Sequence, residues 1–336
     1  MNQSETLLEI KDLCVEFKTM AGTVHAVDHL SYTLHRGEKL GIVGESGSGK
    51  SVSSLAMMQL IPNPPGKVTG GQILYNGKDL VKLSEREMQK IRGNEISMIF
   101  QEPMTSLNPI IRCGKQIAES LRLHRGMKKK EAMEEAIKMM QAVGIANPQA
   151  RAYEYPHQMS GGMRQRVMIA MALACQPQIL IADEPTTALD VTIQAQILAE
   201  MKALQKKLKM AILLITHDLG IVADVADKII VMYAGKIVEE GTVREIFYHP
   251  VHPYTKALLN SVPRLDRDGK EMLCTIEGNI PDMTNPPKGC AFCERCPHAM
   301  NICAQYMPEE KTVSSSHRAS CWMMDERAAK GGVAHA

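Results

Sequence analysis

A glycine-rich octapeptide decides the fold of this chain: Gly44-Glu45-Ser46-Gly47-Ser48-Gly49-Lys50-Ser51. It fits the phosphate-binding pattern G-x-x-x-x-G-K-[ST] at every fixed position. An apolar run at 40–43 predicts a buried parallel strand before it, and residues 51–60 predict a helix after it. In this order, the phosphates of a nucleotide lie at the positive N-terminal end of a helix. A chance match of a glycine-rich turn is the weaker interpretation, so we predict a nucleoside triphosphate site.

The chemistry of this phosphate loop, residues 44–51, predicts how it holds the nucleotide. Its glycines allow backbone N–H groups to turn inward around the β- and γ-phosphates. Lys50 adds a full positive charge, and the hydroxyl of Ser51 is suited to bind Mg²⁺. We therefore expect every residue of the loop to belong to the nucleotide site.

Length and charge narrow the class of protein. A chain of 336 residues suggests two domains. The formal net charge of +2, from 39 basic and 37 acidic residues, predicts neither a nucleic-acid surface nor an anionic-membrane surface. The longest apolar run, 167–175, is far shorter than the roughly 20 residues that a transmembrane helix needs. The first residues lack a signal-peptide pattern, so we expect a cytosolic chain that reaches a membrane only through a partner.

The hydrophobic pattern predicts an α/β fold with several subdomains. Residues 7–16 and 24–34 alternate apolar and polar side chains, which indicates an antiparallel β subdomain. Apolar residues recur at helical spacing within about 102–176, which indicates a helical subdomain. The apolar runs 178–183 and 210–216 predict buried strands of a sheet core.

The amino-acid composition of the chain changes near residue 250. Proline, glycine and cysteine become frequent after this point. We therefore predict a first domain over 1–250 and a small cysteine-rich C-terminal region over 251–336.

Two adjacent carboxylates follow the run 178–183. Asp183 and Glu184 stand at the end of a predicted strand where ligands bind in open α/β sheets. Asp183 is suited to hold Mg²⁺, and Glu184 is suited to polarise the water that attacks the γ-phosphate. The sequence Asp-Glu-Pro is also a good helix start, but its pairing with a phosphate loop favours the catalytic interpretation.

A second glycine-rich helix start lies at 160–163, with the sequence Ser160-Gly161-Gly162-Met163. A helix start of this kind binds anions. It follows the helical insert and cannot easily reach the phosphate loop of its own chain. We therefore expect it to act on a nucleotide held by a second subunit.

Two single residues at predicted strand ends complete the candidate site. Gln101 ends the strand 96–101 where the helical insert begins, and it is placed to report γ-phosphate occupancy to that insert. His217 follows the run 210–216 and is placed to contact the γ-phosphate. A lone histidine among 11 is more often structural than catalytic. The catalytic interpretation of His217 therefore depends on its place in the order of the motifs.

In this order the motifs resemble those of the ATP-binding subunits of ATP-binding-cassette (ABC) transporters, over about residues 7–250. The resemblance implies an ABC-type P-loop ATPase with ATP and Mg²⁺ as ligands. It implies that Glu184 and His217 are catalytic and that Ser51, Gln101 and Asp183 bind Mg²⁺.

The resemblance also assigns residues that contact nucleotide in trans. These are the signature 160–163 and Asp190 of the D-loop 188–190. The family signature usually reads Leu-Ser-Gly-Gly-Gln, and here it begins and ends with Met159 and Met163 while the serine and both glycines are kept. Family members stack adenine on an aromatic residue upstream of the phosphate loop, and Phe17 is the candidate.

Three longer phrases, at 98–109, 155–166 and 249–259, resemble the oligopeptide, dipeptide and nickel importers of this family. The resemblance implies a peripheral subunit on the cytoplasmic face of the inner membrane. Its partners would be a second ATPase subunit, most simply a paralogue, two permeases and an extracytoplasmic binding protein. Dipeptides and longer peptides are the expected cargo, with nickel chelates and glutathione-like compounds as alternatives.

Five of the nine cysteines lie between 290 and 321. Clustered thiols in a reducing compartment indicate a metal site. The spacing from Cys290 through Cys293 to Cys296 resembles an iron–sulfur motif, but Cys303 follows too late for the bacterial ferredoxin pattern. Zinc would suit four thiolates equally, and unligated thiols stay open as an alternative.

The peptide-importer group has a tail pattern in which a [4Fe–4S] cluster has been recognised. Matched to this sequence, that resemblance selects Cys290, Cys296, Cys303 and Cys321, with Cys293 as a competing ligand. We expect the remaining thiols to be ordinary: Cys14, Cys113, Cys175 and Cys274.

Two rival functions belong to other classes. A soluble cassette ATPase that acts on DNA or ribosomes usually carries two cassettes or a coiled-coil insertion, whereas this chain has one phosphate loop and no long heptad run. A redox sensor would use the cysteine tail as its active part and ATP as a regulator. The transporter ATPase remains the favoured interpretation.

Overall fold

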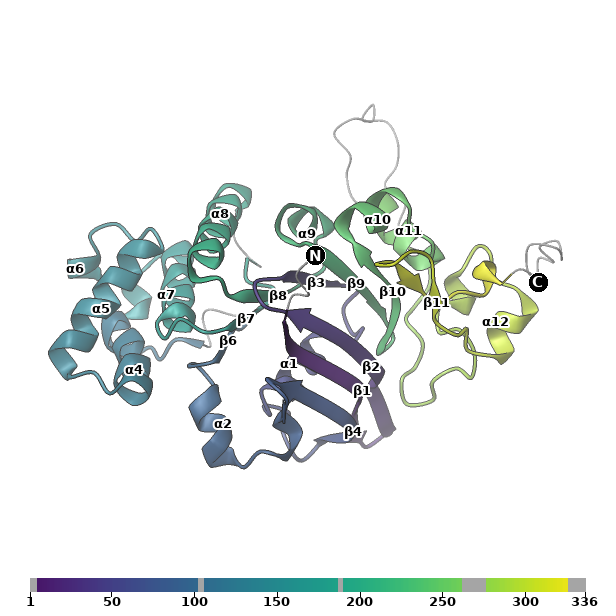
Figure 1. Ribbon diagram of the computed structural model, residues 1–336, viewed down its shortest axis with the longest axis horizontal. Helices are drawn as coiled ribbons and strands as arrows, with labels where there is room; N and C mark the ends of the chain where they lie inside the picture. The colour runs from purple at the N-terminus through teal and green to yellow at the C-terminus, as the bar shows by residue number, and fades with distance from the viewer. Residues whose placement is uncertain (1–4, 102–105, 187–189, 262–275, 326–336) are drawn as a thin grey trace. The chain divides into compact units, whose positions relative to one another are not determined.

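Figure 1 shows the computed structural model of the chain, which describes residues 5–101, 106–186, 190–261 and 276–325. The chain divides into two compact units, each assembled from separate segments. The first unit contains 34–39 and 82–215 together with the start of the chain, and the second contains 7–33, 40–81 and everything from 216 onward.

Parallel strands form the centre of the first unit. Strand β7 (Ile179–Asp183) lies between β6 (Ile96–Ile99) and β8 (Ala211–Thr216), and it is hydrogen-bonded in parallel to both. Every residue of β7 and β8 is buried, as their continuous apolar runs predict. Asp183 ends β7, opposite Ile215.

Helices make up the rest of the first unit, and Figure 1 shows α4 to α7 gathered as one bundle. In the bundle, α4 packs against α5 and α7, and α5 also packs against α7. The apolar stripes of α4 and α5 face inward, with Ile117, Leu121, Ala136 and Met140 buried. This bundle is the predicted helical subdomain. The helices of the unit are α2 (Glu85–Ile91), α4 (Cys113–Arg125), α5 (Lys129–Ala142), α6 (Pro148–Arg151), α7 (Gly161–Leu173) and α8 (Val191–Leu208).

The second unit contains the predicted antiparallel β subdomain. Its four strands lie in the order β2-β1-β4-β5. Along β1 the buried residues alternate with more exposed ones, and a bulge near Cys14 interrupts the pairing with β4. The strands are β1 (Thr6–Thr19), β2 (Gly22–His35), β4 (Gly66–Tyr75) and β5 (Lys78–Asp79).

A mixed set of strands completes the second unit, in the order β3-β9-β10-β12-β11. The pair β3–β9 is parallel, whereas β9 and β10 form an antiparallel hairpin. The cysteine-rich tail extends this set, because Glu239 of β10 pairs with Ala319 of β12. These strands are β3 (Lys39–Val43), β9 (Lys228–Tyr233), β10 (Lys236–Thr242), β11 (Lys311–Thr312) and β12 (Arg318–Ala319).

The second unit also contains short helices, which precede or follow these strands along the chain. They are α1 (Lys50–Met57), α9 (Leu219–Val225), α10 (Val243–Tyr248), α11 (Pro253–Asn260) and α12 (Asn301–Gln305). A single 3₁₀ turn, Cys293–Arg295, lies inside the cysteine cluster. In the part of the chain that the structure describes, no helix combines the length and the apolar character needed to cross a membrane.

Candidate nucleotide site

The phosphate loop connects β3 to α1, and glycine fixes its shape. Gly49, directly before α1, has φ of +95°, and a Cβ at this position would collide with the carbonyl oxygen of Ala26. No other residue fits here without displacing backbone. The tip of the loop, Ser46 and Gly47, is exposed, whereas Ser48 is buried. The loop therefore presents its tip to solvent while its base is held by the fold.

Lys50 lies across the loop. Its Nζ donates to the carbonyl oxygens of Gly44 at 2.7 Å and Glu45 at 2.8 Å, and to the Ser48 hydroxyl at 3.2 Å. Only 6% of Lys50 is exposed. Ser51 follows in the first turn of α1 and is half-buried. The ammonium group and the helix start thus concentrate positive potential at one point, which is what a triphosphate requires.

The first unit brings Gln101 and Glu184 together. The Gln101 amide donates from Nε2 to Glu184 Oε2 at 2.8 Å, although the residues are 83 positions apart. Glu184 has φ of +46°, and its N–H donates to the carbonyl oxygen of Ile215 at 2.8 Å. Left-handed backbone at a glutamate costs roughly 1 to 3 kcal/mol, and such strain collects at functional sites. Asp183, directly before it, is only 5% exposed.

The signature helix start, residues 160–163, is open to solvent. Ser160 caps α7, because its hydroxyl accepts the N–H of Met163 at 3.3 Å. Ser160 and Gly161 are exposed, and a Cβ on Gly161 would meet no atom within 4 Å. Met159 is buried, with its Sδ 3.7 Å from Cys113 Sγ. The methionine that replaces the usual leucine therefore acts as a core residue, and the helix start itself stays accessible.

The structure also locates three other residues of the predicted nucleotide site. Asp190 caps α8 and accepts the N–H of Ile193 at 2.9 Å, while its D-loop neighbours Ala188 and Leu189 lie outside the described residues. His217 directly follows β8 and is exposed. Phe17 is half-buried on β1, and its ring lies against Gly66 of the paired strand β4.

The cysteine cluster is packed around one close backbone contact. A Cβ at Gly289 would collide with the carbonyl oxygen of Cys303, and the N–H of Cys290 donates to that oxygen at 2.7 Å. Burial raises the pKa of the Cys290 thiol to about 12, and the thiolates of Cys303, Cys321 and Cys296 add to this increase. These mutual effects place the four thiols in one region of the tail, but among the described residues no three of their sulfurs lie within 4.8 Å of one another. Cys274 lies outside the described residues.

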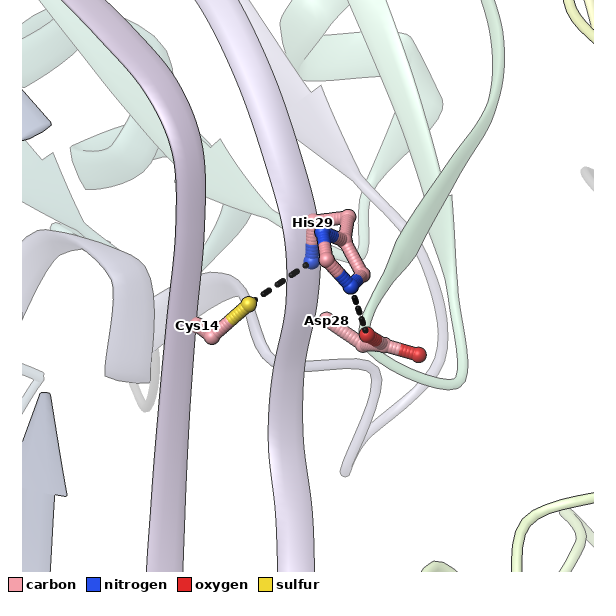
Figure 2. A group of neighbouring side chains, drawn as sticks. All are labelled: Cys14, Asp28 and His29. Atoms are coloured by element: carbon pink, nitrogen blue, oxygen red, sulfur yellow. Dashed lines mark hydrogen bonds and ion pairs between the residues drawn. The ribbon is translucent and has the colours of Figure 1, made fainter. Parts of the chain in front are cut away.

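Figure 2 shows another group of potential metal ligands, on β1 and β2. Donor atoms of Cys14, Asp28 and His29 lie within 4.8 Å of one another. Two of them already have ionic partners: His29 Nδ1 is 2.6 Å from Asp12 Oδ1, and Asp28 Oδ2 is 2.6 Å from Lys236 Nζ. The His29 side chain is 63% exposed. We assign this group to a surface ion-pair network.

Comparison with known proteins decides the family. A family model described as "ABC transporter" matches residues 27–187, and one described as "Oligopeptide/dipeptide transporter, C-terminal region" matches 238–303. The oligopeptide transport ATP-binding protein OppD of Bacillus subtilis is 57% identical over 324 residues, which are 96% of this chain and 90% of that protein. This chain belongs to the ABC transporter ATP-binding family.

Other relatives of this ABC ATPase agree. The dipeptide transport ATP-binding protein DppD of Bacillus subtilis is 55% identical over 96% of each chain. The OppD protein of Salmonella typhimurium is 55% identical over 91% of each chain. A solved ATP-binding cassette, described as a dimer in a post-hydrolysis state bound to ADP and Pi, matches 71% of this chain and 99% of its own with a TM-score of 0.64 and 28% identity. The predicted ABC-type ATPase fold is confirmed.

Sequence reasoning missed residues that lie against the phosphate loop. Tyr254 accepts the N–H of Glu45 through its hydroxyl at 2.8 Å, and Arg295 forms an ion pair with the Glu45 carboxylate. The sequence marks Arg295 only as the neighbour of Cys296. Nothing in it connects this arginine with a loop 250 positions earlier.

Proposed function

We propose that this chain is the ATP-hydrolysing subunit of a membrane importer for oligopeptides or dipeptides. The observation that carries the proposal is 55–57% identity, over nearly the whole chain, to proteins named for oligopeptide and dipeptide transport. The match of residues 238–303 to the peptide-transporter C-terminal region supports the same cargo class.

The proposed mechanism divides the work between positioning and charge stabilisation. Lys50 and the start of α1 neutralise the phosphates. Ser51, Asp183 and Gln101 are the proposed Mg²⁺ ligands, and the ion would neutralise charge that develops on the phosphoryl group. Glu184 orients the attacking water, supported by its hydrogen bond with the Gln101 amide. His217 contacts the γ-phosphate.

We further propose that the signature helix start and Asp190 act on a nucleotide held by a second ATPase subunit. The exposure of Ser160 and the open space beside Gly161 support this arrangement. Phe17 is the proposed platform for adenine, since aromatic rings stack on bases. The second subunit is proposed to be a paralogue, so that two different ATPases form one motor.

The remaining proposed partners are two permeases and an extracytoplasmic binding protein. The subunit would lie on the cytoplasmic side of the inner membrane and touch the bilayer only through the permeases. Support comes from the transport proteins to which the chain is similar. No nucleic acid takes part.

For the cysteine cluster we propose a [4Fe–4S] group held by Cys290, Cys296, Cys303 and Cys321. The number of cysteines in the tail and their resemblance to the peptide-importer pattern support it, and such a group would tie three separate segments of the tail together. Zinc on the same thiolates, or Cys293 in place of one ligand, are the alternatives. Iron, sulfide and zinc analysis of anaerobically purified protein separates these outcomes.

The proposed function is tested by purifying a tagged copy from native membranes and measuring uptake by the reconstituted complex. The expected result is co-purification of two permeases and a second ATPase, with ATP-dependent uptake of labelled peptides. Uptake of nickel chelates or glutathione instead of peptides would overturn the peptide assignment. Isolation with ribosomes or DNA and without permeases would overturn transport.

A further inference from the structure

The phosphate loop is braced by a residue of the cysteine loop, which we define as residues 290–296. Arg295 Nη1 lies 2.7 Å from Glu45 Oε2, and Nη2 lies 3.0 Å from Oε1. The two residues are 250 positions apart and belong to the same compact unit. Only 5% of the Arg295 side chain and 27% of the Glu45 side chain are exposed. A forked, largely buried pair of this kind fixes geometry in a way that an exposed ion pair does not.

Arg295 is itself held from several sides. Nε donates to the carbonyl oxygen of Glu277 at 2.9 Å, and Nη2 donates to that of Ile276 at 3.1 Å. Nη1 also donates to the Tyr233 hydroxyl at 3.2 Å, and the guanidinium lies 5.8 Å from the centre of the Tyr233 ring. These contacts use the donors of the guanidinium fork on both edges, so Arg295 presents one fixed surface to Glu45.

Glu45 is held by its backbone as well as by its carboxylate. Its N–H donates to the hydroxyl of Tyr254, a fully buried residue whose ring packs 4.6 Å from that of Tyr233. Its carbonyl oxygen accepts from Lys50 Nζ at 2.8 Å and from the N–H of Ser48 at 3.2 Å. The position of Glu45 is therefore coupled to the positions of Lys50 Nζ and the Ser48 N–H within the phosphate loop.

The ion pair between Arg295 and Glu45 has an electrostatic effect as well as a structural one. The phosphate-binding pattern leaves this position free, so phosphate binding itself does not require a carboxylate there. An uncompensated negative charge in the loop would repel a triphosphate. Pairing with Arg295 neutralises the carboxylate and directs it toward the cysteine loop.

We propose that Arg295 is a positioning residue for the phosphate loop, through which the cysteine loop sets the affinity of the ATP site. The proposal rests on the nucleotide-binding part of the proposed function and on no assumption about cargo or about the metal in the tail. It makes the C-terminal region part of the nucleotide site without any contact with the nucleotide.

The test measures the dissociation constants of Mg-ATP for the full chain and four variants. Arg295→Met should weaken binding about tenfold or more, since it leaves the Glu45 carboxylate unpaired. Glu45→Gln should weaken binding less than about threefold, and the double variant Glu45→Gln/Arg295→Met should return close to the Glu45→Gln value. Arg295→Lys keeps the charge without the fork and should fall between wild type and Arg295→Met. At saturating ATP, kcat should change less than about twofold, because the charge acts on binding.

The matched control is Arg318→Met, which removes another tail arginine that pairs with Glu240 at 2.6 Å and should leave Mg-ATP affinity unchanged. Equal affinity of wild type and a folded Arg295→Met variant would overturn the inference. So would a double variant as weak as Arg295→Met, because the loss would then come from the fold and not from the unpaired charge. If Arg295→Met does not fold, Arg295→Lys and the double variant decide the same question. Failure of wild type to bind Mg-ATP would overturn the proposed function as well.

Discussion

The phosphate loop and the signature helix start both present a glycine-rich N-terminus of a helix, but the chain holds them in opposite ways. The phosphate loop is fixed by Tyr254 and Arg295, and its lysine is almost fully buried. The signature helix start is exposed, and Gly161 faces open space. One site is preorganised by its own chain, whereas the other is left free to receive a ligand from elsewhere. This difference supports the proposal that the two motifs serve different nucleotides.

Removing the positive charge of Lys50 should have the largest effect on nucleotide binding. Lys50→Met should weaken Mg-ATP binding by about 100-fold or more, because a buried cation that faces phosphate is lost. Equilibrium binding with a fluorescent ATP analogue measures it. The matched control is Lys67→Met, an exposed lysine of the same unit, which should bind normally. Unchanged binding by Lys50→Met would show that the nucleotide does not bind in the phosphate loop.

A substitution in the signature helix start should affect hydrolysis and not nucleotide binding. Ser160→Arg should reduce ATP hydrolysis by the assembled complex by about 100-fold, since it blocks the helix start that stabilises charge in the transition state. It should leave Mg-ATP binding to the isolated chain within about twofold of wild type. Ser84→Arg, which changes the N-cap of α2 in the same unit, controls for lost capping. If Ser160→Arg abolished binding by the isolated chain, the contrast between the two motifs would fail.

The contact between Arg295 and Glu45 also depends on how the tail is anchored to β10. Glu239 is fully buried and accepts the N–H groups of Val251 at 2.7 Å and His252 at 2.9 Å, and its Oε1 lies 2.7 Å from His317 Nε2. Glu239→Ala should lower the free energy of unfolding by about 3 to 5 kcal/mol, because buried donors lose their acceptor. Urea denaturation measures this. A loss below about 1 kcal/mol, as for an exposed pair, would show that the anchor contributes little.

The smaller of the two effects on stability is a pH dependence of the same anchor. Burial, with the charge of Lys256, lowers the pKa of His252 from 6.5 to about 4. The unfolded chain then binds more protons between these values, so stability should fall by up to about 3 kcal/mol as pH drops from 6.5 to 4.

The control for this pH effect is His252→Asn, which keeps an acceptor for the Tyr254 N–H that His252 Nδ1 accepts at 3.1 Å. The variant should lose this part of the pH dependence. Identical stability profiles for the variant and wild type would contradict a buried neutral His252.

Local patterns predicted the parts of the site that are contiguous in sequence. The phosphate loop, the ends of β7 and β8 and the capped start of α7 follow from glycine positions, apolar runs and a capping serine. The contacts of Glu45 with Tyr254 and Arg295 could not be predicted. They join positions more than 200 residues apart, and no local pattern connects the two ends of such a contact. The two-residue strands β11 and β12 exist only because β10 offers an edge, so no hydrophobic pattern marks them.

The most direct measurement compares ATP binding and hydrolysis by the Glu184→Gln variant. Glutamine keeps the size of Glu184 and its hydrogen bond to Gln101, but it cannot act as a base toward water. We expect Mg-ATP affinity within about twofold of wild type and hydrolysis at this subunit's site reduced about 1,000-fold. Normal steady-state hydrolysis by the variant would show that Glu184 is not the catalytic carboxylate.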